Sequence, residues 1–456
     1  MKPRVLFVTG RLAEPALRKV VADLSAVEAE VAVLPITVAA LLTCEWVGRK
    51  LAVPAGTERV VLPGHCNGDL DALATRFGTP FERGPIDLHD LPEFFGHPKR
   101  PSDYGRYDIE ILAEINHAPR LSEAALFALA EHFRASGADV IDLGCDPGSS
   151  WAGIGNTTRR LVADGYRVSV DSFNPAEVEA ALAAGATLVL SENSTNAAWA
   201  TRFPHAEFVA IPDTPSDAAS LNRTVETLGA AGVRVRLDPV LEPIGFGFAA
   251  SLGRYLEVRH RYPDAEMMMG VGNLTELTEV DSAGVNVLLA GFCQELGIRS
   301  VLTTEVANVA RSAVKEFDLA RRLVAHAVRE RVVPKRLEPG LLLLRDRKLA
   351  SHSEEELAEL AARVTDRNYR IFAERGELHI LNGKVHLRGT DPFALFAELQ
   401  SHDAKIGGAH AFYLGYEFAK AVTALTLGKN YAQDRALNWG FLTIPEMSHR
   451  TARKPD

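Results

Sequence analysis

The sequence predicts an α/β protein centred on a (β/α)₈ barrel, with an open α/β domain before it and an α+β domain after it. Three observations lead to this prediction. The chain has 456 residues, more than one ordinary hydrophobic core accommodates. Its middle part alternates between short apolar strands and amphipathic helices, the pattern of a parallel sheet. Polar residues follow almost every one of those strands, as they do at the mouth of such a barrel.

The composition narrows the class of function. Hydrophobic residues make up 47% and charged residues 24% of the chain, which is ordinary for a globular protein. The formal net charge of −9 argues against binding to nucleic acid or to an acidic membrane surface. No stretch reaches the roughly 18 apolar residues of a membrane span. The four cysteines lack CxxC spacing and indicate neither a zinc site nor a disulfide framework. We therefore expect a cytoplasmic protein that acts on small molecules.

Residues 1–100 are expected to form a small Rossmann-like α/β domain that ends in a linker. An apolar strand runs into Gly10, and strands and helices alternate after it. The GxGxxG fingerprint is missing here, so no nucleotide is assigned to this domain. The expected elements are strands at 4–9, 31–34 and 57–62, a helix at 39–47 and an irregular, proline-rich linker at 80–104.

Residues 101–330 are expected to form the barrel. Eight strand–helix units in about 220 residues agree with a barrel in size and order. A doubly wound open sheet is the alternative, because a sequence does not show whether a sheet closes. The expected strands are 109–115, 140–143, 167–170, 188–190, 208–211, 233–237, 267–269 and 300–302, and the helices include 121–135, 177–183 and 285–296.

Residues 331–456 are expected to form a third, α+β domain. A helical pattern at 354–364 precedes two short strands at 378–381 and 384–387. Asn382-Gly383 between them is a strong signal for a two-residue hairpin. A strongly apolar helix at 413–427 could cover a domain or subunit interface, so a homodimer is one possibility.

Polar residues at strand ends are the candidate site. In a barrel the carboxyl ends of all strands open into one mouth, so side chains there converge. A single such residue is more often a helix cap or a turn former, and Asp171 could cap the helix that begins at Pro175. The convergence of all strands is harder to attribute to capping. The candidates are Asn116, Asp142, Asp171, Glu192, Asn193, Asp213, Asp238, Asn273 and Glu305.

Several of these residues lie in motifs that resemble a known family. Residues 137–144, Gly-Ala-Asp-Val-Ile-Asp-Leu-Gly, and 168–172, Val-Ser-Val-Asp-Ser, look like the second- and third-strand motifs of dihydropteroate synthase. Asp238-Pro239 followed by Gly245-Phe246-Gly247-Phe248 resembles that family's DPGFGFGK loop, with an insertion and without the lysine. The string 269–282, Met-Gly-Val-Gly-Asn-Leu-Thr-Glu-Leu-Thr-Glu-Val-Asp-Ser, resembles the dihydropteroate-synthase-related proteins of methanogenic archaea and methylotrophic bacteria.

The resemblance implies a pterin-binding barrel in tetrahydromethanopterin biosynthesis. A pterin presents ring N–H and amine donors beside a carbonyl acceptor, which carboxylates and amides complement. The resemblance implies that the pterin pocket is formed by Asp171, Asn193, Asp238, Gly245, Gly247 and Asn273. It further implies that Asn116 faces the pyrophosphate and a Mg²⁺ ion, and that Asp142 orients that site. Asn116, Asp142 and Asp171 would be the catalytic residues, although a buried structural role for Asp142 is an equal alternative.

The chain also departs from the family pattern. Where the family has a seventh-strand Ser-Arg-Lys and an eighth-strand Arg-x-His motif, this chain has 271–273, Val-Gly-Asn, and 303–305, Thr-Thr-Glu. The fourth-strand Asn is displaced, so Ser191, Glu192 and Asn193 compete for its place. Arg311 or basic residues of another domain could supply the missing charge.

These departures keep two other functions open. Gly270-Val271-Gly272-Asn273 and the run 170–175 also resemble pterin-dependent methyltransferases that act with a corrinoid protein. A pterin-binding protein without turnover is the third possibility. The favoured function is a dihydropteroate-synthase-like transferase that condenses a dihydropterin-methyl pyrophosphate with an arylamine and releases pyrophosphate. By resemblance the arylamine would be ribofuranosylaminobenzene 5′-phosphate.

Overall fold

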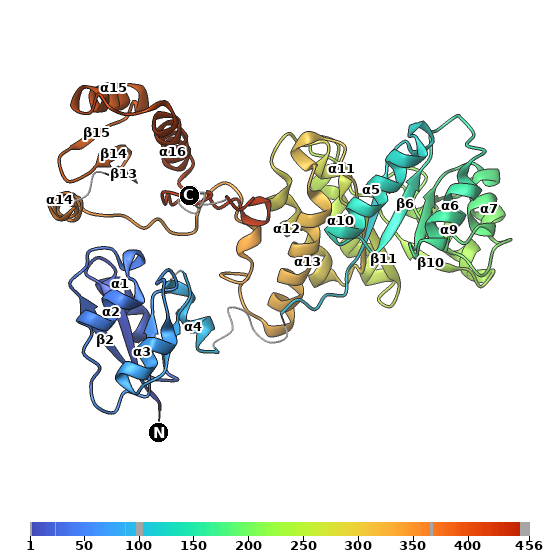
Figure 1. The fold of residues 1–456 in the computed structure, drawn as a ribbon. Coiled ribbons are helices and arrows are strands. Elements are labelled where there is room, and N and C mark those ends of the chain that lie inside the picture. Colours follow the sequence, from blue (N-terminus) through green and yellow to red (C-terminus); the bar gives the residue numbers. More distant parts are fainter. Residues whose placement is uncertain (1, 23, 87, 97–103, 365–367, 447–456) are drawn as a thin grey trace. The chain divides into compact units, whose positions relative to one another are not determined.

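A computed structural model gives the fold of residues 2–446, apart from 23, 87, 97–103 and 365–367 (Figure 1). The chain divides into two compact units, one formed by Asp103–Leu341 and the other by Met1–Ser102 with Leu342–Asp456. The expected boundary near residue 100 lies outside the described residues. The division at 100 and 330 into three domains therefore stays a prediction.

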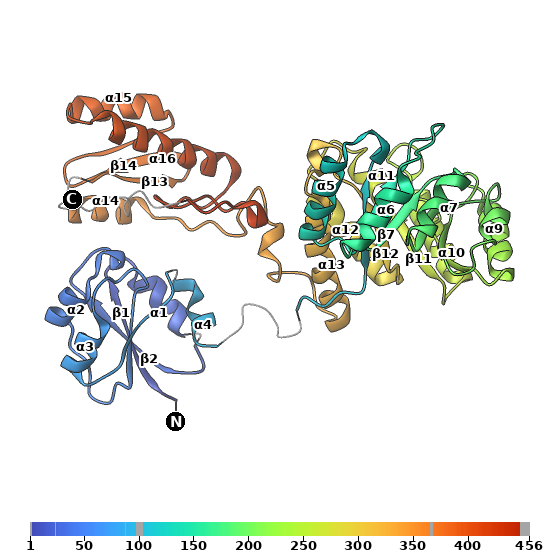
Figure 2. The same cartoon turned by 45° about the vertical axis from the view of Figure 1, so that its right-hand side comes forward.

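The N-terminal part is a parallel sheet with helices on both faces. The strand order is β2-β1-β3-β4, with all pairs parallel. Figure 2 shows α2 and α3 on one face of this sheet and α1 and α4 on the other. The expected β-α-β alternation is confirmed. The elements are β1 (Arg4–Gly10), α1 (Glu14–Ala22), β2 (Glu28–Leu34), α2 (Cys44–Lys50), β3 (Arg59–Leu62), α3 (Leu70–Phe77), β4 (Phe81–Arg83) and α4 (Leu91–Phe94).

Two expectations for this part were wrong. The single helix expected at 39–47 is a 3₁₀ turn, Ala39–Leu41, followed by α2, because Thr43 caps α2 by accepting a hydrogen bond from the Trp46 N–H. The linker expected at 80–104 contains β4 and α4. Its prolines are compatible with a strand here because they lie outside β4, with Pro80 before the strand and Pro85 after it.

The C-terminal part is a three-stranded antiparallel sheet with helices. The expected hairpin at Asn382-Gly383 is confirmed, and the Asn382 side chain accepts hydrogen bonds from the N–H groups of Lys384 and Val385. Lys384 therefore belongs to the turn and not to the strand. The sequence did not predict the first strand or α15. The elements are α14 (Glu354–Arg363), β13 (Arg370–Glu374), β14 (Glu377–Leu381), β15 (His386–Gly389), α15 (Pro392–His402) and α16 (Gly408–Leu427).

The middle of the chain is a closed barrel of eight parallel strands. Closure rules out the doubly wound alternative, and all eight expected strands are confirmed to within a few residues. The strands are β5 (Glu110–Ile115), β6 (Val140–Gly144), β7 (Val168–Asp171), β8 (Leu188–Glu192), β9 (Glu207–Ala210), β10 (Arg234–Leu237), β11 (Glu266–Gly270) and β12 (Ser300–Thr303).

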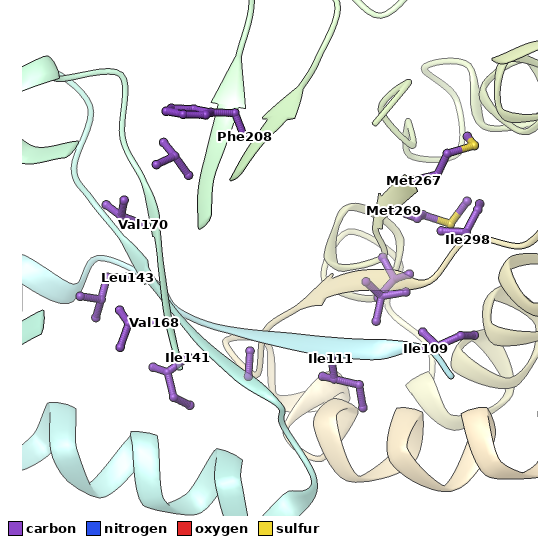
Figure 3. Packing of buried hydrophobic residues seen from close by; sticks show 14 of the residues in the cluster. Ile109, Ile111, Ile141, Leu143, Val168, Val170, Phe208, Met267, Met269 and Ile298 are labelled. Carbon is purple, nitrogen blue, oxygen red and sulfur yellow. The ribbon is translucent and has the colours of Figure 1, made fainter. Parts of the chain in front are cut away.

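Helices surround the barrel and bury the outward-facing half of each strand. Figure 3 shows ten labelled members of this layer, which extend from the strands toward the surrounding helices. Alternate residues of a strand face opposite sides, so the remaining half faces the barrel interior. The helices are α5 (Glu123–Ser136), α6 (Ile154–Ala163), α7 (Pro175–Ala183), α8 (Ala197–Ala200), α9 (Ala218–Ala230), α10 (Phe248–Arg261), α11 (Gly272–Thr275), α12 (Ser282–Leu296) and α13 (Ala313–Glu330).

The barrel interior is layered. Its middle is apolar and contains Leu112, Val140, Leu188, Val209 and Met268. Near the amino ends of the strands, the guanidinium of Arg236 binds the carboxylates of Glu110 at 2.6 Å and Glu207 at 2.9 Å. This charged group is balanced because every charge in it has an opposite partner.

A buried arginine joins the last helix to the barrel. Arg321 of α13 is 1% exposed. It donates hydrogen bonds to the carbonyl oxygens of Ile109 and Gly137 and forms ion pairs with Asp139 and Asp318. One side chain thus connects α13 to the segments that lead into β5 and β6.

Arg321→Leu is expected to lower the unfolding free energy by roughly 3 kcal/mol, because it leaves buried acceptors and carboxylates without their cation. Urea unfolding followed by circular dichroism measures the loss. Arg159→Leu on the exposed side of α6 is the matched control, with an expected change of less than about 0.5 kcal/mol. Equal changes in the two variants would contradict the role given to Arg321.

Candidate functional site

Three neighbouring strands place carboxyl groups at the mouth of the barrel. Glu114 of β5 lies beside Asp142 of β6 in the strand register, and Asp171 ends β7 beside Gly144. The Ser169 hydroxyl donates to Asp142 at 2.6 Å, and the Ser191 hydroxyl donates to Asp171 at 2.8 Å. The Glu114 side chain packs closely over Gly144, where a Cβ atom would lie 2.5 Å from Glu114 Oε1.

Crowding and burial favour the neutral forms of these three acids. Burial, and secondarily the charge of Asp171, raises the pKa of Glu114 to about 7. Burial also raises the pKa of Asp171 and, together with its acidic neighbours, the pKa of Asp142. A ligand that donates hydrogen bonds would favour the ionised carboxylates and would therefore be bound by this side of the mouth.

A second acidic group lies across the mouth, at the end of β10. The Asp238 carboxylate accepts hydrogen bonds from the Tyr255 hydroxyl at 2.5 Å and the Val240 N–H at 2.8 Å. Val240 adopts φ 66°, an unusual conformation for a β-branched residue, which indicates a constrained loop. Burial nonetheless raises the pKa of Asp238 to about 6. A Cβ atom on Gly270 would lie about 4.0 Å from both Asp238 and the Asn273 amide, so these groups converge.

A cavity of about 210 Å³ opens between β5, β11 and β12. Its polar lining consists of Glu114, Asn116, Asn273, Glu276, Thr303 and Thr304. The Asn273 amide donates to the Leu241 carbonyl at 2.9 Å, which leaves its oxygen available to a ligand. The Glu276 carboxylate accepts hydrogen bonds from the N–H groups of Val306 and Ala307, which follow β12. It thereby positions that loop. Carboxyl and amide groups thus face a space large enough for a small ring system.

Glu192, at the end of β8, is the least satisfied of the mouth carboxyls. The strand register shifts between Val189 and Glu192, and Ser191 adopts φ 71°. Glu192 is fully buried, and within the described residues neither of its carboxyl oxygens has a hydrogen-bond partner. Burial raises its pKa to about 8, so it is mostly protonated at neutral pH.

The expected site residues fall into two groups. Asn116, Asp142, Asp171, Asp238 and Asn273 lie at the mouth or line the cavity. The other three, Asn193, Gly245 and Gly247, lie in loops and shape their local conformation. The Asn193 oxygen accepts from Thr195, and Gly247 precedes α10 at φ 129°, where a Cβ atom would meet Glu242 at 2.5 Å. Gly245 lies in the same loop at φ 89°.

Sequence analysis missed Glu114, Glu276 and Thr304. Glu114 could have been found, since it is a polar residue near the carboxyl end of a mostly apolar strand, where inward side chains approach the mouth. Glu276 and Thr304 follow strands in loops, where polar residues are ordinary, and they carried no comparable signal.

Cations near the mouth are paired elsewhere. His117 and Arg120 bind Asp146, and Arg254 binds Glu242 at 2.7 Å. Among the described residues, no ion pair involves Glu114, Asp142, Asp171, Glu192 or Asp238, and no Lys or Arg lines the cavity. The mouth is therefore acidic and accepts hydrogen-bond donors more readily than anions.

The residues of the mouth include possible ligands for a metal ion. Within the described ranges, no three His, Cys, Asp or Glu side chains converge as metal ligands. Mg²⁺ needs only one or two protein oxygens when a phosphate supplies others. The Asn116 amide and the Glu114 carboxyl are oxygen donors on one cavity wall and fit that requirement.

Two comparisons with known protein sequences found matches to this chain. Residues 3–86 match the model of a family of unknown function, DUF6513. An uncharacterised protein of Methanocaldococcus jannaschii is 28% identical over 370 residues, covering 72% of this chain and 69% of that protein.

Solved structures similar to this chain include two dihydropteroate synthases. The Yersinia pestis enzyme is 17% identical with a TM-score of 0.40, and the Thermus thermophilus enzyme is 22% identical with a TM-score of 0.39. Each alignment covers 49% of this chain and 94% of the other chain.

In the part of the chain that the structure describes, no helix is both long and apolar enough to span a bilayer.

The burial of Glu192 predicts a specific pH dependence of stability. Its pKa is higher in the folded state than in the unfolded state, so stability is lost as pH rises from about 4.5 toward 8. The loss has a limit of about 1.4 kcal/mol per pH unit. Glu192→Gln removes this pH-dependent loss of stability. The urea midpoint of the variant, relative to that of the wild type, should therefore be higher at pH 8 than at pH 5.

Glu226→Gln on the exposed side of α9 is the control and should follow the wild type at both pH values. A Glu192→Gln midpoint with the same pH dependence as the wild type would show that Glu192 is ionised and solvated in the folded protein.

Proposed function

We propose that the barrel mouth binds a pterin and that the protein is a dihydropteroate-synthase-like transferase. The observation that carries this proposal is one cavity lined by Glu114 and Asn273, with the charge of Asp171 acting on Glu114 and with Asp238 beside the lining residue Gly270. The amine and ring N–H groups of a pterin can donate to carboxylates, and its carbonyl can accept from an amide. The motif resemblance of 137–144 and 168–172 supports the same ligand.

Asp171 and Asp238 would bind the donor edge of the pterin. Both have raised pKa values, so two N–H donors would stabilise the ionised form and release protons on binding. The second N–H of the Asn273 amide would donate to the pterin carbonyl, and its free oxygen would accept from a pterin N–H. Asn193, Gly245 and Gly247 would come close to the ligand only if the loops after β8 and β10 move.

The proposed reaction joins the arylamine nitrogen to the methylene carbon of the pterin as the carbon–oxygen bond to pyrophosphate breaks. The nitrogen then loses one proton. Glu114 lines the cavity and has a pKa of about 7, which suits a group that accepts a proton near neutral pH. Asp142 would act by positioning Glu114 and Asp171, because it lies beside Glu114 in the strand register, interacts electrostatically with both carboxyls and does not line the cavity.

The departing pyrophosphate needs positive charge, which a Mg²⁺ ion held by Asn116 would supply. Ribofuranosylaminobenzene 5′-phosphate as the acceptor, and hence a place in tetrahydromethanopterin biosynthesis, rests on the resemblance of residues 269–282. A homodimer stays a prediction from the apolar helix at 413–427.

One observation favours a second candidate, the corrinoid-dependent pterin methyltransferase. No Lys or Arg lines the described walls of the cavity, and a methylated pterin carries no pyrophosphate that would need one. The protonated acids of the mouth could instead hydrogen-bond a pterin ring nitrogen. The corrinoid would then be carried by a partner protein.

Pyrophosphate release separates the two candidates. The protein is incubated with dihydropterin-methyl pyrophosphate, Mg²⁺ and either p-aminobenzoate or ribofuranosylaminobenzene 5′-phosphate, and pyrophosphate is measured enzymatically. Release that requires both organic substrates is expected. Tight binding of methyl-tetrahydropterin without such release would favour the methyltransferase instead.

Asp171→Asn and Asp238→Asn are each expected to weaken pterin binding by about 10- to 100-fold, because each loses a charge-assisted hydrogen bond. Isothermal titration with dihydropterin measures the affinity. Asp213→Asn is the matched control: Asp213 also follows a strand, but its carboxylate accepts from Ser194. Full affinity in both site variants would exclude the assigned pocket.

A further inference from the structure

The C-terminal sheet carries two histidines on the same face. Alternate residues of a strand share a face, and the strand register places His379 of β14 opposite Arg388 of β15, with His386 two residues before Arg388. Figure 2 shows α14 on one side of this sheet and α15 and α16 on the other. The histidines lie on the α14 side, because the residues that alternate with them pack against α15 and α16.

The two imidazoles lie close together. His379 Nδ1 is 3.3 Å from His386 Nε2. Two nitrogens that bind one tetrahedral zinc ion, each at roughly 2.0–2.1 Å, are about 3.3 Å apart. Hydrogen bonds of N–H groups in proteins are shorter, with donor–acceptor distances of roughly 2.7–3.2 Å. The separation of the two rings therefore agrees with a shared metal ion better than with a direct hydrogen bond.

His379 is an unfavourable residue to bury in these surroundings. Its side chain is 1% exposed, and within the described residues its Nε2 atom has no hydrogen-bond partner. A buried polar atom without a partner lowers stability, so an apolar side chain at this position would give a more stable domain. A bound ion is one of the few reasons for a folded protein to keep such a group.

A cavity of about 400 Å³ gives a metal ion access to the pair. Both histidines line it, and Glu355 of α14 adds a carboxylate to the same walls. Arg388 also lines the cavity, but its charge is balanced by Glu354 at 3.0 Å. Burial lowers the pKa of both histidines, so the imidazoles are neutral near pH 7 and keep lone pairs for a metal.

We propose that His379 and His386 bind a divalent transition-metal ion, with Zn²⁺ as the representative, in this cavity. In the part of the chain that the structure describes, no three His, Cys, Asp or Glu side chains are arranged as metal ligands. The site is therefore an open one, and water and the Glu355 carboxylate are available for the remaining positions. Imidazole ligands favour Zn²⁺ over Mg²⁺, which prefers oxygen. The site does not depend on the function proposed for the barrel.

The first test measures Zn²⁺ binding to the full-length protein by isothermal titration, after metal has been removed with a chelator. One equivalent is expected to bind, and excess Mg²⁺ should not displace it. His386→Ala is expected to weaken binding at least about tenfold, because one of the two imidazoles is lost. His402→Ala, at the exposed end of α15, is the matched control and should bind within about twofold of the wild type. Absence of Zn²⁺ binding, or unchanged binding in His386→Ala, would overturn the proposal.

His379→Leu distinguishes a metal ligand from a structural histidine. It is expected to lose Zn²⁺ binding and, without metal, to unfold at the same or a higher urea concentration than the wild type, because Nε2 has no partner to lose. Zn²⁺ should raise the melting temperature of the wild type and of Asp171→Asn, but not that of His379→Leu or His386→Ala. A marked loss of stability in metal-free His379→Leu would show instead that the pair is a structural hydrogen bond, and it would refute the metal site.

Discussion

The candidate site depends on one constraint. Several carboxyl groups are buried away from water at the carboxyl ends of the barrel strands. At the amino ends of the strands, Arg236 balances Glu110 and Glu207, so burial there is compensated by ion pairs. At the carboxyl ends, the described structure places no cation against Glu114, Asp171 or Asp238. Burial raises the pKa values of all three groups, and the charge of Asp171 adds to the rise at Glu114, whose pKa of about 7 leaves it partly protonated near neutral pH.

This asymmetry connects structure to chemistry. A barrel that only had to be stable could pair its charges at both ends, or replace them with apolar residues, as it does in the middle layer. Acids with raised pKa values respond to a ligand, because each N–H donor that approaches stabilises the ionised carboxylate. Part of the stability lost by burying Glu114 and Asp238 is thereby recovered on binding. The mouth is therefore organised around a ligand rich in hydrogen-bond donors.

The sequence predicted the barrel well because the relevant signals are local. Strand period, glycine breaks and helix caps recur in every unit, and all eight strands were found to within a few residues. Strand-end residues such as Asp171 and Asn273 could be identified because the fold places every strand end at the same mouth. Glu192 was only one of three competing candidates, since its burial depends on a register shift at Ser191. Such a shift depends on tertiary packing, which has no sequence period.

The prediction for the segment between the N-terminal sheet and the barrel was also wrong in part. The linker expected at 80–104 was inferred from its prolines, yet β4 lies within it, because Pro80 and Pro85 flank the strand and leave the N–H groups of residues 81–83 intact. That short strand matters, since the loop after it forms one side of a cavity beside β1 and β3. In both the N-terminal sheet and the barrel, a cavity lies at the carboxyl ends of parallel strands. The N-terminal sheet lines it mostly with apolar side chains, together with Thr9, His65 and Arg435, whereas the barrel lines it largely with acids, amides and threonines.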